Sequence, residues 1–307
     1  MIVKENLAGT IKEESVFIPF LENDLLHLKR FCGNPTGPVV FMLHGTIENG
    51  RIFYSANGKG LAPFLALHGF DVFVADLRGR GKSSPSINRH SRYGLTESIL
   101  EEIPAFINEI KKIRGNVPQQ WIAHSWGGIL LLCTLARKQI QADISSVIFF
   151  GTKRLITIWG IRKFLLINIF YNYIFSAMVS LYGFVNLKKF GIGKENETDK
   201  ARRQTYEWVT KEQWKDEDGF DYGKVLRNLT LPPALFIAGG GDVVLGHPKD
   251  VKLLMRETGK NHDAFYLAAK SNGNLNDYDH ITMLTHPDAP RDHFQFVMNW
   301  LLLHHNT

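Results

Sequence analysis

Six short runs of almost continuous apolar residues constrain the fold of this chain more than any other feature. They occupy residues 39–43, 71–76, 120–123, 146–150, 234–238 and 264–268. Because these runs lack polar alternation, both faces of each strand must be covered, as in a parallel sheet between two layers of helices. The sequence therefore predicts an α/β protein.

Several segments between and after these runs have the period of amphipathic helices. Residues 96–114, 126–138 and 292–304 are predicted helices. Residues 16–20 and 25–29 predict an antiparallel hairpin near the start of the chain. Two strands followed by repeated strand–helix pairs indicate a doubly wound, mostly parallel sheet.

Residues 164–187 interrupt this alternation. They form 24 residues without Asp, Glu, Lys or Arg, between the basic pairs Arg162-Lys163 and Lys188-Lys189. The length suffices for a membrane-spanning helix, but a span here would leave strands of one sheet on opposite sides of a bilayer. We expect instead a helical cap at residues 153–225, inserted into a core formed by residues 1–152 and 226–307.

The apolar part of this cap, Phe164 to Leu187, needs cover in water. Either the cap helices bury one another over a pocket, or part of their surface receives the acyl chain of a substrate. Both alternatives place the segment next to a binding site.

Charge and composition narrow the partners. The 307 residues include 36 Lys and Arg against 30 Asp and Glu, a net charge of +6, and residues 153–194 hold seven basic residues and no acidic one. The apolar interior of that region is unlike a nucleic-acid groove, so we expect no nucleic-acid partner. Basic residues around an apolar segment are instead compatible with peripheral contact with an anionic membrane.

Two further features concern the compartment. The cysteines Cys32 and Cys133 are too few for a disulfide framework, and the first residues carry charges where a signal peptide has an apolar core. These features predict a cytoplasmic protein. The sequence does not predict an oligomeric state.

The candidate nucleophile is Ser125, in Ala123-His-Ser-Trp-Gly-Gly128, which lies between a predicted strand and a predicted helix. A serine on such a sharp turn is lifted above the sheet edge, beside helix amides that stabilise negative charge. The alternative is an ordinary strand-to-helix turn. The usual pattern of this turn is G-x-S-x-G, and Ala123 replaces its first glycine.

Asp242 and His280 are the candidate partners of Ser125. Asp242 follows a late strand, and His280 lies in a polar loop between the last strand and the last helix. The three residues follow one another in the chain as Ser125, Asp242 and His280. In such a set the acid can orient the histidine, and the histidine can take the proton of the serine. Asp277 and Asp279, close to His280 in sequence, are the competing acids.

Two backbone amides are candidates for an oxyanion hole. The loop His44-Gly45-Thr46 follows the first central strand, and Trp126 follows the candidate nucleophile. We expect the amides of Thr46 and Trp126 to bind the oxyanion. His44 is interpreted as a structural loop residue. The glycine-rich residues 76–83 have the spacing of neither common nucleotide-binding motif, so we interpret them as a tight turn that shapes the pocket.

Together these motifs resemble the α/β-hydrolase superfamily over nearly all of the chain outside residues 153–225. The motifs are HGT, D-x-R-G-x-G-x-S, HSWGG, GGGD and YDH, in the order of that superfamily. Residues 95–106, 241–251 and 279–290 also resemble its acid-lipase and lysophospholipase-like branches. Asp stands at the position of Ser125 in the dehalogenases and epoxide hydrolases of this fold, which the chain therefore resembles less.

The resemblance implies a serine hydrolase that acts on a carboxylic ester with an apolar acyl part, either a small-molecule ester or a lipid. It implies no metal and no organic cofactor. An acyltransferase or thioesterase with the same three residues is an alternative, because the triad does not decide what attacks the acyl-enzyme. A catalytically silent binding protein of this fold is another alternative.

Overall fold

The computed structural model describes residues 2–6, 9–138, 140, 143–158, 160, 169, 171, 173–259 and 263–305. Within them, nine strands form one sheet in the order β1-β2-β3-β5-β4-β6-β7-β8-β9. The strands are β1 (Ile2–Asn6), β2 (Gly9–Phe20), β3 (Asp24–Cys32), β4 (Val39–Leu43), β5 (Asp71–Asp76), β6 (Gln119–His124), β7 (Ile144–Phe150), β8 (Ala234–Gly239) and β9 (Asp263–Ala268).

The strands from β5 to β9 in that order pair in parallel, whereas β1, β2 and β3 are antiparallel to their neighbours. The six apolar runs are thus confirmed as strands, and the predicted hairpin is the longer pair β2 and β3. The first strand, β1, was not predicted, because its sequence is not an apolar run.

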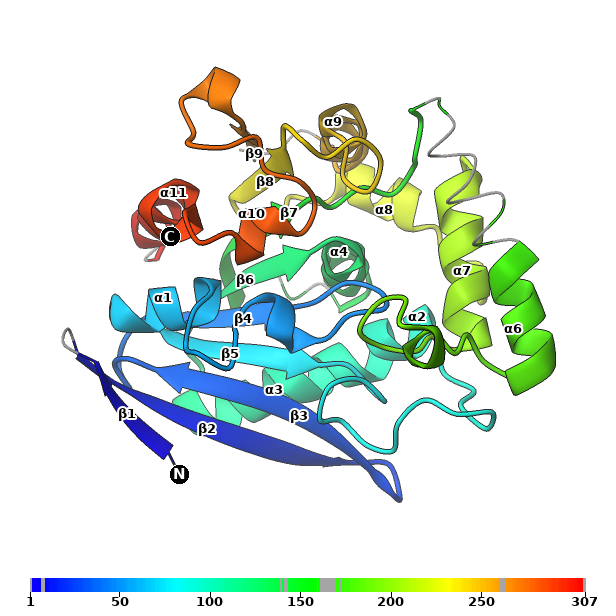
Figure 1. Cartoon of the computed structure of the whole chain (residues 1–307), viewed down its shortest axis with the longest axis horizontal. Coiled ribbons are helices and arrows are strands. Elements are labelled where there is room, and N and C mark those ends of the chain that lie inside the picture. The colour runs from blue at the N-terminus through cyan, green and yellow to red at the C-terminus, as the bar shows by residue number, and fades with distance from the viewer. Residues whose placement is uncertain are drawn as a thin grey trace.

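Helices cover both faces of the sheet (Figure 1). On one face α1 (Leu61–Leu67) and α11 (His293–Leu303) pack against alternate residues of β4, Val40 and Met42. On the other face α3 (Ile103–Arg114), α4 (Trp126–Lys138), α8 (Tyr222–Asn228) and α9 (Pro248–Glu257) pack around Val39, Phe41 and Leu43. This burial on both sides explains the continuous apolar strands. A short helix, α10 (Thr282–Thr285), follows His280.

The helix predicted over residues 96–114 is interrupted, which corrects the sequence prediction. It consists of α2 (Leu95–Glu97), a π-helical turn (Ser98–Glu102) and α3. Pro104 lies in the first turn of α3 and lacks a backbone N–H. The amide of Ile103 bonds to the carbonyl of Ser98 five residues earlier, so the wider turn absorbs the irregularity.

The segment between β7 and β8 contains α6 (Phe175–Tyr182), α7 (Asp199–Thr210) and α8. In Figure 1, α6 and α7 lie to the right, beyond the carboxyl ends of β4 and β5. Residues 159, 161–168, 170 and 172 of the predicted cap lie outside the described residues. Among the described helices, none is long and apolar enough to cross a membrane.

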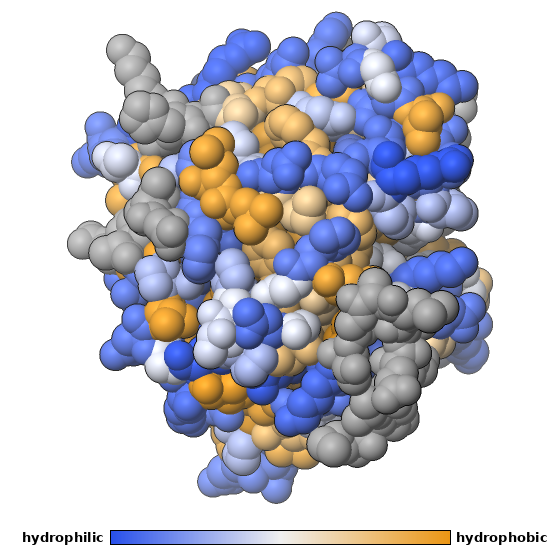
Figure 2. All heavy atoms as spheres, turned by 90° about the vertical axis from the view of Figure 1, so that its left-hand side faces the viewer, coloured by the Kyte–Doolittle hydropathy of each residue, from blue (hydrophilic) through white to orange (hydrophobic). Residues whose placement is uncertain are grey.

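On the face that Figure 2 shows, hydrophilic side chains are interspersed with small apolar patches. Leu302 and Leu303, at the end of α11, are exposed apolar side chains. Such isolated exposed side chains are ordinary on a protein surface. In sheets of this kind, ligands bind at the carboxyl ends of the parallel strands.

Candidate active site

Ser125 occupies a strained turn between β6 and α4. Its φ angle is +52°, a conformation that residues with a side chain adopt rarely and that is concentrated at functional sites. The amide of Ser125 donates a hydrogen bond to the carbonyl of Phe150, at 2.8 Å. A Cβ atom at Gly127 would lie 2.5 Å from the carbonyl oxygen of Leu43, so the turn requires glycine there.

The alanine that replaces the first glycine of the motif creates no strain. Ala123 is fully buried in β6 and is not one of the described residues with a positive φ angle. The backbone at Ala123 therefore does not require glycine.

His280 and Asp242 form a close pair. Nδ1 of His280 lies 2.7 Å from Oδ2 of Asp242, and both residues are buried. The ring packs against Gly151, whose φ angle is +59° and where a Cβ atom would lie 2.8 Å from Nδ1 of His280. The two competing acids bond elsewhere: Asp277 accepts from the amide of Lys270, and Asp279 accepts from amides at the start of α10.

The electrostatics of this pair are those of a general base and its orienting acid. Burial lowers the pKa of His280 and outweighs the opposing effect of the hydrogen bond that His280 donates to Asp242. Burial acts to raise the pKa of Asp242, but the contact with His280 and two backbone amides lower it below its ordinary value. The imidazole of His280 is therefore neutral beside the ionised carboxylate of Asp242. Its proton is on Nδ1, and Nε2 is available to accept a second proton.

Ser125 Oγ has no hydrogen-bond partner among the described residues, His280 included. Contacts between a nucleophile and its base are often long without substrate and tighten when it binds. Ser125 and His280 nevertheless line one cavity of about 960 Å³. Thr46 and Trp126 line the same cavity, and no described residue accepts a hydrogen bond from either of their amides. The structure thus brings together all of the predicted site residues.

A second ion pair, which was not predicted from the sequence, lies next to the turn that holds Ser125. Nδ1 of His124 lies 2.6 Å from Oε1 of Glu48, and Nε2 of His124 donates to the carbonyl oxygen of His280 at 2.9 Å. The same Glu48 oxygen accepts from the amide of Gly45 at 2.5 Å. Burial acts to lower the pKa of His124, but Glu48 raises it above the ordinary value. A charged His124–Glu48 pair thus joins the loop after β4, the nucleophile turn and the backbone of His280.

The walls of the cavity are mostly apolar. They include side chains from the core loops and from the segment between β7 and β8: Ile52, Ile156, Tyr171, Phe175, Val209 and Leu245. Tyr171 and Phe175 belong to the segment Phe164 to Leu187 for which a substrate-binding role was expected. A volume near 960 Å³ with apolar walls suits a chain-like or drug-sized ligand.

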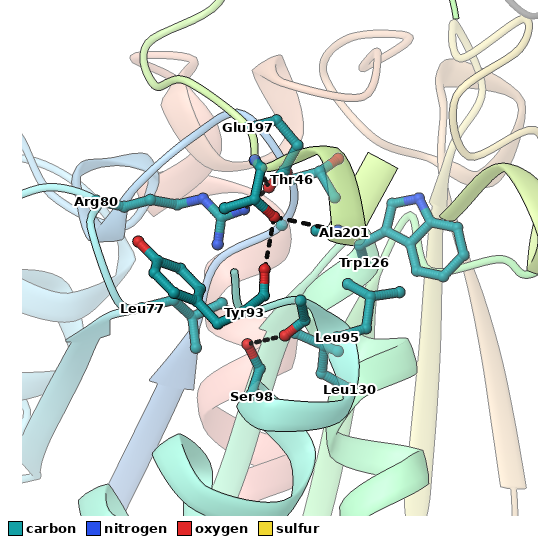
Figure 3. Close-up of a pocket in the computed structure, with 13 residues that line it drawn as sticks. Thr46, Leu77, Arg80, Tyr93, Leu95, Ser98, Trp126, Leu130, Glu197 and Ala201 are labelled. Atoms are coloured by element: carbon teal, nitrogen blue, oxygen red, sulfur yellow. Dashed lines mark hydrogen bonds and ion pairs between the residues drawn. The ribbon is translucent and has the colours of Figure 1, made fainter. Parts of the chain in front are cut away.

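A smaller cavity of about 10 Å³ is lined by Thr46 and Trp126 together with residues of the segment between β7 and β8 (Figure 3). We call this segment, residues 151–233, the covering segment. Arg80, from the loop after β5, and Glu197 both line this cavity and form an ion pair at 2.5 Å. Both side chains are almost fully buried. This ion pair attaches the covering segment to the core next to the candidate oxyanion hole.

A neighbouring acid makes a second attachment. Oε1 of Glu195 accepts from Nδ2 of Asn49 at 2.6 Å and from the amide of Gly81 at 2.9 Å. The carbonyl of Ile47 accepts from the amides of Lys194 and Glu195. Ile47 has a φ angle of +51°, which is strained for a β-branched residue, so these bonds hold the loop after β4 in an unusual conformation.

The interpretations of His44 and of residues 76–83 as structural agree with the contacts. Nδ1 of His44 donates to the carbonyl of Gly45, and its Nε2 accepts from the amide of Leu77. Asp76 accepts from the amides of Gly50 and Lys82. These bonds fold the turn after β5 against the loop after β4. Among the described residues, no group of three or more His, Cys, Asp or Glu side chains could hold a metal ion.

The comparisons with known proteins agree with this fold. Residues 38–177 match the family model for the alpha/beta hydrolase fold. The chain has the α/β-hydrolase fold. Most proteins with this fold are enzymes. The comparison of this sequence with the curated proteins found no match.

Several solved structures are similar over nearly the whole chain. An esterase from Exiguobacterium antarcticum superposes with a TM-score of 0.63 at 17% identity, covering 94% of this chain and 100% of the esterase. A membrane phospholipase A, described as a bacterial virulence factor, has a TM-score of 0.63 at 17% identity and coverages of 98% and 88%. A thioesterase domain from the curacin biosynthetic pathway has a TM-score of 0.54 at 16% identity and coverages of 95% and 99%.

Proposed function

We propose that the protein is a serine hydrolase that cleaves carboxylic esters with an apolar acyl part. Ser125 is the nucleophile, His280 the general base and Asp242 the acid that orients it. His280 takes the proton of Ser125 through Nε2 as Oγ attacks the carbonyl carbon. His280 then donates the proton to the leaving alcohol, and a water activated by His280 releases the acid.

One observation carries the proposal: the 2.7 Å contact between His280 Nδ1 and Asp242 Oδ2, in a cavity that Ser125 also lines. The strained φ angle of Ser125 supports it, because strain at a residue facing a cavity is a mark of function. The amides of Thr46 and Trp126 would bind the oxyanion, a contribution of about 3–4 kcal/mol for each donor.

The apolar walls of the cavity support an apolar acyl part. Four of these wall residues come from the segment between β7 and β8: Ile156, Tyr171, Phe175 and Val209. Burial of each methylene in such a pocket stabilises the bound substrate by about 0.8 kcal/mol. The fold is shared with esterases and a phospholipase, so both small esters and lipids are reasonable substrates to test.

A thioester is the second candidate substrate. The same three residues cleave oxygen and sulfur esters, and a thioesterase domain is among the similar structures. Transfer to an alcohol instead of water is distinguished by its product. A binding protein without catalysis would hydrolyse none of these compounds.

The test is a panel of p-nitrophenyl esters and matched thioesters with acyl chains of two to twelve carbons, with and without an alcohol acceptor. We expect hydrolysis that increases with chain length in the native protein and not in Ser125→Ala. Binding to anionic vesicles at low salt, lost at high salt, would support a lipid source of substrate. No turnover of any ester or thioester by the native protein would contradict the proposal.

A further inference from the structure

Lys153 is a buried cation that the mechanism above does not use. It follows β7 by three residues, its exposed fraction is 3%, and it lines the same cavity as Ser125 and His280. Within the part of the chain that the structure describes, its ammonium makes no hydrogen bond and no ion pair. A buried charge without a partner is costly for a protein, so such a side chain needs an explanation.

The next residue shows what a structural cation looks like at this place. Arg154 pairs with Glu257 through two hydrogen bonds, at 3.0 and 2.6 Å, and donates to the carbonyls of Trp208, Lys211 and Glu212. Arg154 is therefore saturated by the protein. Lys153, one residue earlier, faces the cavity instead.

The two acids that attract Lys153 electrostatically form no hydrogen bond and no ion pair with it, and Oδ2 of Asp250 is buried without a hydrogen-bond partner among the described residues. Asp242 is bonded to His280, and Asp250 accepts from the amide and hydroxyl of Thr157. Both acids attract the lysine and raise its pKa, but burial outweighs them and lowers it to about 8. Lys153 is thus mostly a cation near pH 7, and its positive charge is directed to the cavity.

The remaining charged side chains that line the cavity carry a net positive charge. Arg51 and Lys194 lie at its exposed rim, and the acid in its wall, Glu48, is neutralised by His124. Gly151, two residues before Lys153, touches the ring of His280. Because two residues span at most about 7 Å, the backbone of Lys153 lies near the reacting groups.

We propose that Lys153 binds an anionic group of the substrate, a carboxylate or a phosphate, close to the ester bond that Ser125 attacks. This inference rests on the proposed function. It defines the substrate class more narrowly: an ester that combines an apolar chain with a negative charge. The charge belongs either to the acyl part or to the alcohol part, and the experiment separates these sources.

The experiment compares matched pairs of esters. In the first arm, p-nitrophenyl half-esters of dicarboxylic acids with four to ten carbons are compared with neutral esters of the same length. In the second, acyl glycerol phosphates are compared with acyl glycerols. We expect kcat/KM for the charged ester to exceed that for its neutral partner at least tenfold in one of the two arms. If the charge is on the acyl part, the preference in the first arm should have a maximum at one chain length.

The variant Lys153→Met keeps the length of the side chain and removes its charge. It should lose the tenfold preference mainly through KM, whereas Lys153→Arg should keep most of it. Lys194→Met removes the same charge at the solvent-exposed rim, where screening is strong, and should change the preference by less than about threefold. Because Lys153→Met removes an uncompensated buried charge, its melting temperature should not fall.

A binding measurement separates this inference from the proposed function. Ser125→Ala is titrated by calorimetry with a monomethyl dicarboxylate and with the neutral methyl ester of equal length. Preferential binding of the anion, lost in Ser125→Ala combined with Lys153→Met, supports the inference even if the native protein hydrolyses no ester. Equal treatment of charged and neutral ligands, or a preference that survives Lys153→Met, overturns it.

Discussion

Two parts of the molecule line the same cavity, the loops after the strands of the sheet and the segment between β7 and β8, and they contribute different kinds of side chain to it. The loops are fixed by buried polar contacts, such as His280 with Asp242 and His124 with Glu48. The covering segment contributes mainly apolar side chains such as Phe175, and it is attached through Glu195 and Glu197.

This difference separates chemistry from selectivity. Buried hydrogen bonds fix atoms within tenths of an ångström, which proton transfer requires, because a misplacement of 1 Å can reduce a rate about 100-fold. Apolar contacts are non-directional and depend on area. Substitutions in the loops should therefore reduce turnover of every substrate, whereas substitutions in the covering segment should change which substrates are preferred.

The largest effect is expected for Ser125→Ala. Removal of the nucleophile eliminates the covalent route, so kcat should fall by up to about 10⁶-fold for every ester. Thermal melting should be nearly unchanged, since only one oxygen is removed. A residual rate within tenfold of the native enzyme would place the nucleophile at another residue.

The next effect concerns the acid. Asp242→Asn should reduce turnover by about 10⁴-fold, because the amide favours the wrong tautomer of His280. Asp279→Asn is the matched control, since Asp279 bonds to the start of α10 rather than to His280. If kcat fell in the control and not in Asp242→Asn, the assignment of the acid would be wrong.

A smaller loss is expected when the second ion pair is broken. Glu48→Gln removes the charge that balances His124 and weakens the link between the loop after β4 and the backbone of His280. We expect kcat to fall about 10- to 100-fold with KM changed by less than about threefold, as for a positioning residue. Steady-state kinetics and the rate of fluorophosphonate labelling should decline together. Unchanged kcat would mean that the pair has no part in positioning.

The pH dependence follows from the burial of His280. Because its pKa is below the usual 6.5, the base is neutral and active above that pKa and becomes protonated as the pH falls through it. The value of kcat/KM for a neutral ester should therefore rise about tenfold per pH unit on the acid side and then reach a plateau. The midpoint of this rise should lie below pH 6.5. A midpoint above 6.5 in a pH–rate profile would contradict this assignment.

The smallest effects belong to the covering segment. Each added methylene should raise kcat/KM about fourfold until the pocket is filled, equivalent to about 0.8 kcal/mol. Phe175→Ala should reduce this gain for octanoyl esters and leave acetyl esters within about twofold. Leu181→Ala, on the same helix but with an exposed fraction of 67%, is the control. A uniform loss for all chain lengths in Phe175→Ala would show that this segment also positions the catalytic groups.

The fold could be predicted largely because parallel strands buried on both faces leave an unmistakable apolar run. The helix predicted over residues 126–138 has the bounds of α4. Local patterns were insufficient where structure depends on a partner: β1 is held by pairing with β2, and the π-helical turn before α3 arises next to Pro104. The predicted cap boundaries, residues 153 and 225, remain a prediction.

For the site, chain order was enough to select Ser125, Asp242 and His280, which the structure places around one cavity or in direct contact. Glu48 and His124 could not be paired in advance. They lie 76 residues apart and meet because β4 and β6 are neighbours in the sheet. For Lys153 the available signal was a lysine directly after an apolar strand, but its burial and lack of a partner depend on how the covering segment packs.

Site-mapped covalent labelling tests most directly whether Ser125 is an activated nucleophile. The native protein is treated with a fluorophosphonate and digested, and the modified peptide is sequenced by mass spectrometry. We expect a single adduct on Ser125 that is absent from Ser125→Ala and formed much more slowly in Asp242→Asn. An adduct on another residue, or no adduct while the protein hydrolyses esters, would contradict it.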